Sequence, residues 1–199
     1  MPDRPPVFRP PGWKPRKAWA RSTPAPTERI RGREGQRLRA EVLAEEPLDL
    51  PERALATTAV WWTVPPALLE EAGLAAADLP GSAHAAEHCS IGLLPLFATC
   101  DRWDIGGVST ALHADTGACT VFVYDGHPGG AGFAERGYER AAAWLRATRD
   151  AIAACECPTG CPSCVQSPKC GNGNEPLDKA GAVRLLDVVL AAGLGSEVG

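Results

Sequence analysis

Apolar and polar residues follow a regular pattern only beyond about residue 48. Residues 55–64 are rich in β-branched and aromatic side chains, including the run A-V-W-W-T-V, and Pro65-Pro66 ends the segment. This composition predicts a strand over 55–64. Small residues end the next apolar segment, which predicts a short helix over 66–76.

The stretch 81–98 contains H-A-A-E-H-C-S-I-G-L-L-P-L-F, which is apolar over most of its length. It predicts a mostly buried helix with Ser82 as the N-cap and a break at Pro95. A hairpin is predicted next, because V-S-T-A-L-H-A at 108–114 and C-T-V-F-V-Y-D at 119–125 flank the turn D-T-G-A. Gly117 in that turn is free to adopt positive φ.

Two longer helices complete the predicted elements. The first covers 131–153 and delivers the chain to a cysteine-rich loop; its apolar side carries Phe133, Trp144, Leu145 and Ile152. The second covers 179–191, with Asp178 as N-cap and Gly193 at its end. The elements predict an α+β fold: a small antiparallel sheet with packed helices, and a cysteine loop between the last two helices.

The first 40 residues differ from the rest in composition. Eight prolines interrupt any periodicity, and eleven Lys/Arg against three acids give a charge of +8, whereas residues 41–199 carry −12. We therefore expect a disordered basic arm over 1–40 and one domain over 41–199. The arm either attracts nucleic-acid phosphates weakly or is a solvated tail without a role.

Five of the eight cysteines fall within C-E-C-P-T-G-C-P-S-C-V-Q-S-P-K-C at 155–170. Prolines and a glycine turn this segment back on itself, which favours a tetrahedral thiolate site with zinc as the default metal. Cys161 and Cys164 have the spacing of a zinc knuckle, the cysteines at 155 and 157 supply a second pair, and Cys170 is left over. Four protein ligands fill the coordination shell of zinc and leave no position for water, so such a zinc is structural.

Other chemistry at these cysteines stays open on spacing alone. A disulfide staple suits small secreted domains, a thioredoxin-like pair needs a strand before it and a helix after it, and an iron–sulfur cluster uses the same thiolates. The cysteines at 89, 100 and 119 stand alone among apolar residues and are expected to be buried thiols. Eight such cysteines, without a signal peptide or a membrane-length apolar run, favour a reducing cytoplasm. Heavy use of Ala, Arg, Gly and Pro is typical of a GC-rich bacterial genome.

Residues 84–88 match H-x-x-E-H, which on a helix places two histidines on one face. In inverted zincins such histidines hold zinc and the glutamate is the general base, so a small zinc-dependent hydrolase is one hypothesis. The alternative is that the motif has no catalytic role and is a chance match in an alanine-rich helix. The glycines of 125–130 either cradle an anion or form a plain strand-to-helix connection. The segment C-D-R-W-D-I-G-G at 100–107 is either a turn with a local Asp–Arg pair or a charged loop that faces a partner or backbone phosphates. The chain has no G-x-x-x-x-G-K-[ST] and no D-E-x-H motif, so we expect no ATP hydrolysis by the isolated chain.

Three segments together resemble the C-terminal domain of the mitomycin-repair-type, RecQ4-like superfamily 2 DEAD/DEAH-box DNA helicases. These are E-H-C-S-I-G-L-L-P-L-F-A-T-C-D-R-W-D-I-G-G, V-F-V-Y-D-G-H-P-G-G-A-G-F-A-E, and the cysteine segment continued through G-N-G-N-E-P-L-D-K-A-G-A. The resemblance covers about 41–195. It implies a helicase-associated zinc-binding domain whose ligands are Cys155, Cys157, Cys161 and Cys164.

In that family the ATPase lies in two RecA-like domains upstream, which this chain lacks, and the whole enzyme unwinds DNA with 3′–5′ polarity in repair. The leading hypothesis is a zinc-binding accessory domain of a DNA-repair helicase that is not catalytic alone. Its expected partners are a helicase core, in cis in the family or in trans here, and DNA contacted weakly through 1–40, with no membrane. The alternatives are the hydrolase at 84–88 and a metal-stapled protein-interaction module.

Overall fold

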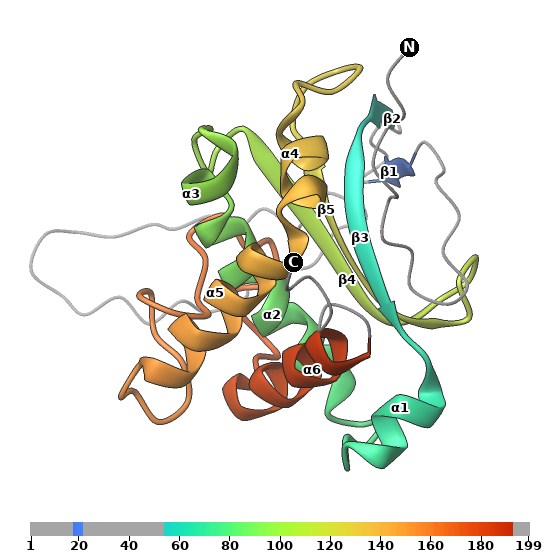
Figure 1. Ribbon diagram of the computed structural model, residues 1–199, viewed down its shortest axis with the longest axis vertical. Helices are drawn as coiled ribbons and strands as arrows, with labels where there is room; N and C mark the ends of the chain where they lie inside the picture. Colours follow the sequence, from blue (N-terminus) through green and yellow to red (C-terminus); the bar gives the residue numbers. More distant parts are fainter. Residues whose placement is uncertain (1–17, 22–53, 193–199) are drawn as a thin grey trace, which may run out of the picture.

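The computed structural model describes residues 18–21 and 54–192 (Figure 1). Its main sheet is antiparallel, with strand order β3-β5-β4, where the strands are β3 (Ala59–Val64), β4 (Ile105–His113) and β5 (Ala118–Asp125). Two short strands, β1 (Ala18–Arg21) and β2 (Ala54–Thr57), pair separately. The helices are α1 (Pro66–Glu71), α2 (Leu79–Leu93), α3 (Pro95–Ala98), α4 (Phe133–Glu139), α5 (Ala141–Ala154) and α6 (Lys179–Ala191). The predicted α+β class is confirmed, and the cysteine loop lies between α5 and α6.

Strands β4 and β5 form the predicted hairpin, with Gly117 at a φ of 63° in its turn. The hairpin begins at residue 105, earlier than predicted, because Ile105 already pairs with Asp125. The strand predicted over 55–64 is divided at Thr58. Its first part pairs with β1 and its second with β5, so one apolar run serves two sheets.

Helix α2 is the centre of the domain. Nearly all of its residues are buried, because it packs against β4 and β5 on one side and against α5 and α6 on the other (Figure 1). Small residues make the close approach to α6 possible: a Cβ added to Gly181 would lie 2.0 Å from the Ser82 hydroxyl. A helix with so little exposed surface has no polar face, and its buried histidines and glutamate therefore need local partners.

Several predicted boundaries were wrong for identifiable reasons. Ser82 is not an N-cap, because α2 begins at Leu79 and the Ser82 hydroxyl donates to the Asp78 carbonyl at 2.8 Å. The helix predicted over 131–153 divides at Arg140, and the helix predicted over 66–76 ends at residue 71. The break at Pro95 and the Asp178 cap are confirmed; the Asp178 carboxylate accepts from the Gly181 N–H at 2.8 Å.

The expected arm over 1–40 and the helix end at Gly193 lie largely outside the described residues. Within that arm only Ala18–Arg21 is described, and it forms β1. Among the described residues, no helix is both long and apolar enough to cross a bilayer.

Candidate metal centres

Four cysteine sulfurs converge in the loop that follows α5. These residues, called the four-cysteine cluster below, are Cys155, Cys157, Cys161 and Cys164. The Sγ of the first lies 3.5 Å from that of Cys157 and 3.6 Å from that of Cys161. The Sγ of Cys164 lies 3.5 Å from that of Cys157 and 3.8 Å from that of Cys161. The sequence-predicted ligands are thus brought together within one loop.

Local backbone structure explains this convergence. Helix α5 ends at Ala154, and Cys155 is already extended. The turn from Cys161 to Cys164 is closed by the Cys164 N–H, which donates to the Cys161 carbonyl at 3.0 Å, and the Cys161 N–H donates to the Cys164 Sγ at 3.3 Å. Gly160, with a φ of 128°, reverses the chain just before this knuckle.

The cluster has the dimensions of a tetrahedral zinc site. With zinc–sulfur distances of about 2.3 Å, neighbouring sulfurs of a tetrahedron lie about 3.8 Å apart. The measured range of 3.5–3.8 Å fits that requirement. A helix rather than a strand precedes the cluster, which contradicts the thioredoxin-like alternative.

The thiols of the cluster differ in acidity. The Ser163 backbone N–H, followed by the neighbouring Cys155 thiol, lowers the pKa of Cys161 to about 7, whereas burial raises the pKa of Cys164 to about 12. Zinc binds thiolates, so a bound cation would have to displace the Cys164 proton at neutral pH. The charge of the metal, rather than the protein alone, is what makes four close thiolates compatible.

A lysine that gave no signal in the sequence holds this cluster. The Lys179 ammonium, at the start of α6, donates to the carbonyls of Cys155 and Cys157, the latter at 2.6 Å. It links the end of α5 to the start of α6 through the loop. The sequence could not indicate this role, because both acceptors are backbone carbonyls, which every residue has.

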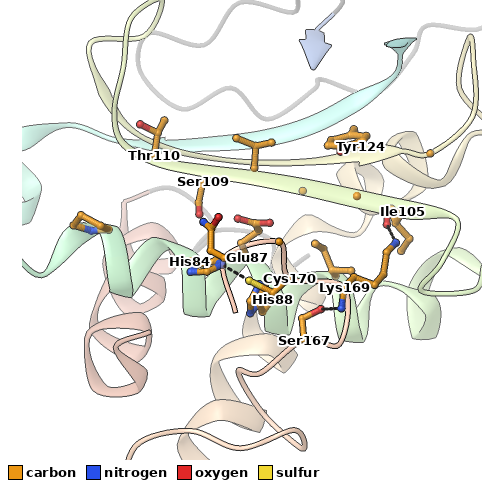
Figure 2. A pocket seen from close by; sticks show the side chains of 18 of the residues that line it. His84, Glu87, His88, Ile105, Ser109, Thr110, Tyr124, Ser167, Lys169 and Cys170 are labelled. Atoms are coloured by element: carbon orange, nitrogen blue, oxygen red, sulfur yellow. Dashed lines mark hydrogen bonds between the residues drawn. The ribbon is translucent and has the colours of Figure 1, made fainter. Parts of the chain in front are cut away.

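A second group of metal-binding side chains lies at the other end of the same loop. His84, His88 and Cys170, called the histidine–cysteine cluster below, offer ligand atoms that all lie within 4.8 Å of one another (Figure 2). The Cys170 Sγ is 3.4 Å from Nε2 of His84, and the two imidazole centroids are 4.2 Å apart. Cys170, which had no partner in the sequence-based prediction, therefore joins the two histidines of the H-x-x-E-H motif.

The glutamate of that motif lies beside the cluster, where Figure 2 shows it facing β4 near Ser109. Burial raises the pKa of Glu87 to about 7, an effect that the hydrogen bond to Ser109 partly offsets. Burial also lowers the pKa of His88 to about 4, so this imidazole is neutral at physiological pH. The largest cause of both shifts is the loss of water around the charged groups on burial.

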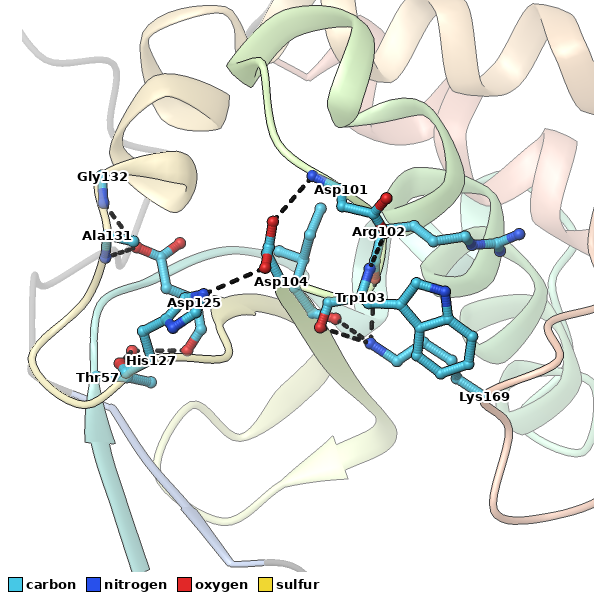
Figure 3. Close-up of polar contacts among 11 residues, drawn as sticks. Thr57, Asp101, Arg102, Trp103, Asp104, Asp125, His127, Ala131, Gly132 and Lys169 are labelled. Atoms are coloured by element: carbon cyan, nitrogen blue, oxygen red, sulfur yellow. Dashed lines mark hydrogen bonds and ion pairs between the residues drawn. The ribbon is translucent and has the colours of Figure 1, made fainter.

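These residues border a cavity of about 830 Å³ between α2, β4 and the loop after Val165. Its wall includes the histidine–cysteine cluster, the glutamate at 87 and Lys169. The Lys169 ammonium donates to the carbonyls of Arg102, Trp103 and Ile105, at 3.1, 3.4 and 2.6 Å (Figure 3). This lysine fastens the Cys170 segment to the turn before β4.

In the two polar loops predicted from the sequence, the aspartate carboxylates accept from nearby backbone N–H groups, whereas the buried Nε of Arg102 has no hydrogen-bond partner among the described residues. In the turn at 100–107, Asp101 accepts from the Trp103 N–H at 2.8 Å, and Asp104 accepts from the Asp101 N–H at 3.0 Å (Figure 3). The glycine-rich connection after β5 does cradle an anion, but the anion is the buried Asp125 carboxylate, which accepts N–H bonds from Ala131, Gly132 and Ala134. The plain strand-to-helix interpretation of this loop is confirmed.

The remaining cysteines behave largely as predicted. Cys89 and Cys119 are buried in the core, and Cys100 is half-buried. Burial raises the pKa of the first two thiols to about 12 and about 11. They are unreactive at neutral pH for that reason.

Comparisons with known proteins give consistent matches. Residues 86–165 match the family model of the MrfA Zn-binding domain. An uncharacterised protein of Methanocaldococcus jannaschii is 41% identical over 113 residues, which cover 54% of this chain and 99% of the relative. The uncharacterised ATP-dependent helicase YprA of Bacillus subtilis is 35% identical over 127 residues, 63% of this chain but 16% of the helicase. A crystal structure of the DUF1998 helicase MrfA bound to DNA has a TM-score of 0.57 and 29% identity, covering 72% of this chain and 18% of that one.

Proposed function

Because the chain belongs to the family of the MrfA Zn-binding domain, we propose that it is a zinc-stapled accessory domain of an ATP-dependent DNA helicase. Zinc is the cofactor that the family match and the four-cysteine cluster support. We assign the four sulfurs of that cluster as its ligands. The observation that carries this assignment is the set of sulfur–sulfur distances, 3.5–3.8 Å.

A zinc held by four thiolates has no open position, so its contribution is to folding rather than to chemistry. In this chain it would fix the loop that joins α5 to α6, both of which pack on α2. Through α2 the loop is connected to the sheet. A metal at this point therefore stabilises the relative placement of all three helices, which is what a rigid accessory domain requires.

The proposed partner is a helicase core. The segment makes up 16% of the helicase YprA, so in that relative it belongs to a much longer polypeptide. In the M. jannaschii relative the same segment covers 99% of the chain, which supports a domain that folds without a covalently attached core. We propose that the present domain works with a core on either the same or a separate chain.

The role proposed for the domain is to position that core rather than to grip DNA strongly. Residues 41–199 carry a charge of −12, which repels phosphates, and residues 1–40 carry +8. We expect weak, salt-dependent DNA binding that is mostly lost when residues 1–40 are deleted. Fluorescence anisotropy of both proteins at two salt concentrations measures this, and tight, salt-insensitive binding by the truncated protein would contradict it.

A chimera tests the accessory function directly. In the YprA helicase, the matching segment is deleted or replaced by residues 54–192 of this chain, and ATP-dependent DNA unwinding is measured. We expect the deletion to abolish unwinding and the replacement to restore it, whereas a replacement carrying Cys161→Ser does not restore it. The proposal fails if the deleted helicase unwinds normally, or if a folded, zinc-loaded replacement leaves it inactive.

The isolated chain is expected to hydrolyse no ATP, because its sequence contains no phosphate-binding loop and no acid box. A steady-state ATPase assay with and without DNA checks this expectation. Hydrolysis that co-purifies with the chain and disappears on a point substitution in it would contradict the proposal.

A further inference from the structure

We infer that His84, His88 and Cys170 form a second zinc site, distinct from the four-cysteine cluster, with a fourth position open to the adjoining cavity. The site joins residues 86 positions apart in the chain. The family match begins at residue 86 and ends at residue 165, so His84 and Cys170 lie outside it. The inference rests on the geometry of these three side chains.

The two imidazoles are oriented as metal ligands. Nδ1 of His84 lies 2.9 Å from the Pro176 carbonyl, and Nδ1 of His88 lies 2.8 Å from the Val165 carbonyl. A carbonyl only accepts, so each Nδ1 carries the proton and each Nε2 keeps its lone pair. Metal-binding histidines are commonly held this way, with the outer nitrogen donating to a backbone carbonyl.

The thiol completes a convergent set. The Cys170 Sγ lies 3.4 Å from Nε2 of His84, and the Asn174 backbone N–H donates to the same sulfur at 3.3 Å. This sulfur therefore faces both a backbone N–H and the nitrogen of the imidazole that would share the metal with it. The ligand atoms of the three residues fall within a sphere that one cation can reach with small side-chain adjustments.

Two simpler roles for these side chains account for less of the geometry. If the histidines only filled the core, the bonds from their Nδ1 atoms to the two carbonyls would explain one nitrogen of each ring. They would not explain why both rings lie beside the same sulfur. A reactive thiol–imidazole pair would use His84 and Cys170 but gives no reason for the second imidazole, whose ring centroid lies 4.2 Å from the first. A shared cation uses both Nε2 atoms and the sulfur together.

The donor set also identifies the metal and the type of site. One thiolate and two imidazoles suit zinc, and three protein ligands leave a fourth position for water or another small ligand. The three residues form part of the wall of the cavity of about 830 Å³ (Figure 2), so a fourth ligand would enter from that cavity. An exchangeable monodentate donor, such as water or imidazole, is the ligand class that this position would take.

Metal content of the full-length chain tests the inference first. We expect two zinc ions per wild-type chain by inductively coupled plasma mass spectrometry. Cys170→Ser and His88→Gln should each retain one zinc and remain folded, because the four-cysteine cluster is untouched. Cys100→Ser, which alters a half-buried thiol outside both clusters, is the matched control and should retain two.

Cobalt then shows whether the second site is open. In zinc-loaded protein with the second site emptied by mild chelation, added Co²⁺ should give a sulfur-to-cobalt charge-transfer band that Cys170→Ser abolishes. Imidazole should shift the cobalt d–d bands, since only this site has a free position. The inference is overturned if wild type binds a single zinc, if the second ion persists in both variants, or if Cys170 reacts with iodoacetamide in a protein that never binds cobalt.

Discussion

The two clusters occupy opposite ends of one loop, yet they are assembled in different ways. The four-cysteine cluster draws all its donors from residues 155–164, whereas the histidine–cysteine cluster combines α2 with a segment 86 positions later. The first set of donors is closed and complete; the second has three donors and faces a cavity. A site built locally is suited to folding the loop, and a site built across elements exists only after the domain has folded.

Each end of the loop is fastened by a lysine that binds backbone carbonyls. Lys179 binds the carbonyls of Cys155 and Cys157, and Lys169 binds two carbonyls of the turn before β4 and that of Ile105, the first residue of the strand. Partial burial lowers the pKa of Lys169, and the nearby Arg102 lowers it further. Each cluster therefore has an ammonium group beside it that ties its segment of the loop to backbone carbonyls.

Removing one ligand of the closed cluster should produce the largest effect. Cys161→Ser is expected to release the structural zinc and to lower the free energy of unfolding by several kcal/mol, since metal binding and folding are coupled. Metal analysis and urea unfolding measure both quantities, with Cys100→Ser as control. A metal-free wild type that is fully folded would contradict the assignment, and so would a Cys161→Ser variant that retains as much zinc as the wild type.

The buried carboxyl beside the open cluster should make stability depend on pH. Folding raises the pKa of Glu87 from 4.5 to about 7, so the folded state binds more protons between those values. The stability that protonated Glu87 provides is therefore complete below about pH 4.5 and is lost as the pH rises through about 7. The full shift corresponds to about 3 kcal/mol.

Glu87→Gln removes this titration while keeping the shape of the side chain. The wild type should lose stability relative to the variant as the pH rises from about 5 to about 8, measured by urea unfolding. His88 acts in the opposite direction, because its lowered pKa reduces stability below about pH 6.5, but it is common to both proteins and cancels in the difference. A difference that does not change with pH would show that Glu87 is ionised in the folded state.

Adding a methyl group on the β4 side of the cavity should affect metal binding at one cluster and not at the other. A Cβ on Gly107 would lie 2.7 Å from both Glu87 Oε1 and Ile91 Cδ1, so Gly107→Ala should destabilise the domain by about 1–3 kcal/mol. We expect weaker metal binding at the histidine–cysteine cluster and an unchanged affinity of the four-cysteine cluster, measured by chelator competition. Gly171→Ala is the control, because its added Cβ meets nothing within 4 Å; an equal effect of both variants would contradict this expectation.

The smallest effects should come from the two lysines, tested as a crossed pair. Lys179→Met leaves two carbonyls of the four-cysteine cluster without their ammonium donor and should weaken that cluster about tenfold. Lys169→Met should instead weaken the histidine–cysteine cluster by a similar factor, through the Cys170 segment. Chelator competition on both variants gives the affinity of each cluster in each protein, and equal losses at both clusters in either variant would show that the loop responds as one unit.

The sequence by itself determined the features that depend on neighbouring residues. The four-cysteine cluster, the turn at Gly117, the Asp178 cap and the break at Pro95 follow from short-range geometry, because their partners lie within a few positions along the chain. The α+β class followed for the same reason, since each element has its own period of apolar residues.

Only the tertiary structure decided the features whose partners are distant in sequence. Cys170 had no assignable partner until folding placed it beside His84, and the H-x-x-E-H motif gave no third ligand. The division of one apolar run at Thr58 depends on which strand lies alongside each half. Apolar spacing specifies a face to be buried but not the surface that buries it. In the same way, the four-cysteine cluster could be predicted because its donors are close in sequence, whereas the histidine–cysteine cluster could not, because its donors meet only in the folded domain.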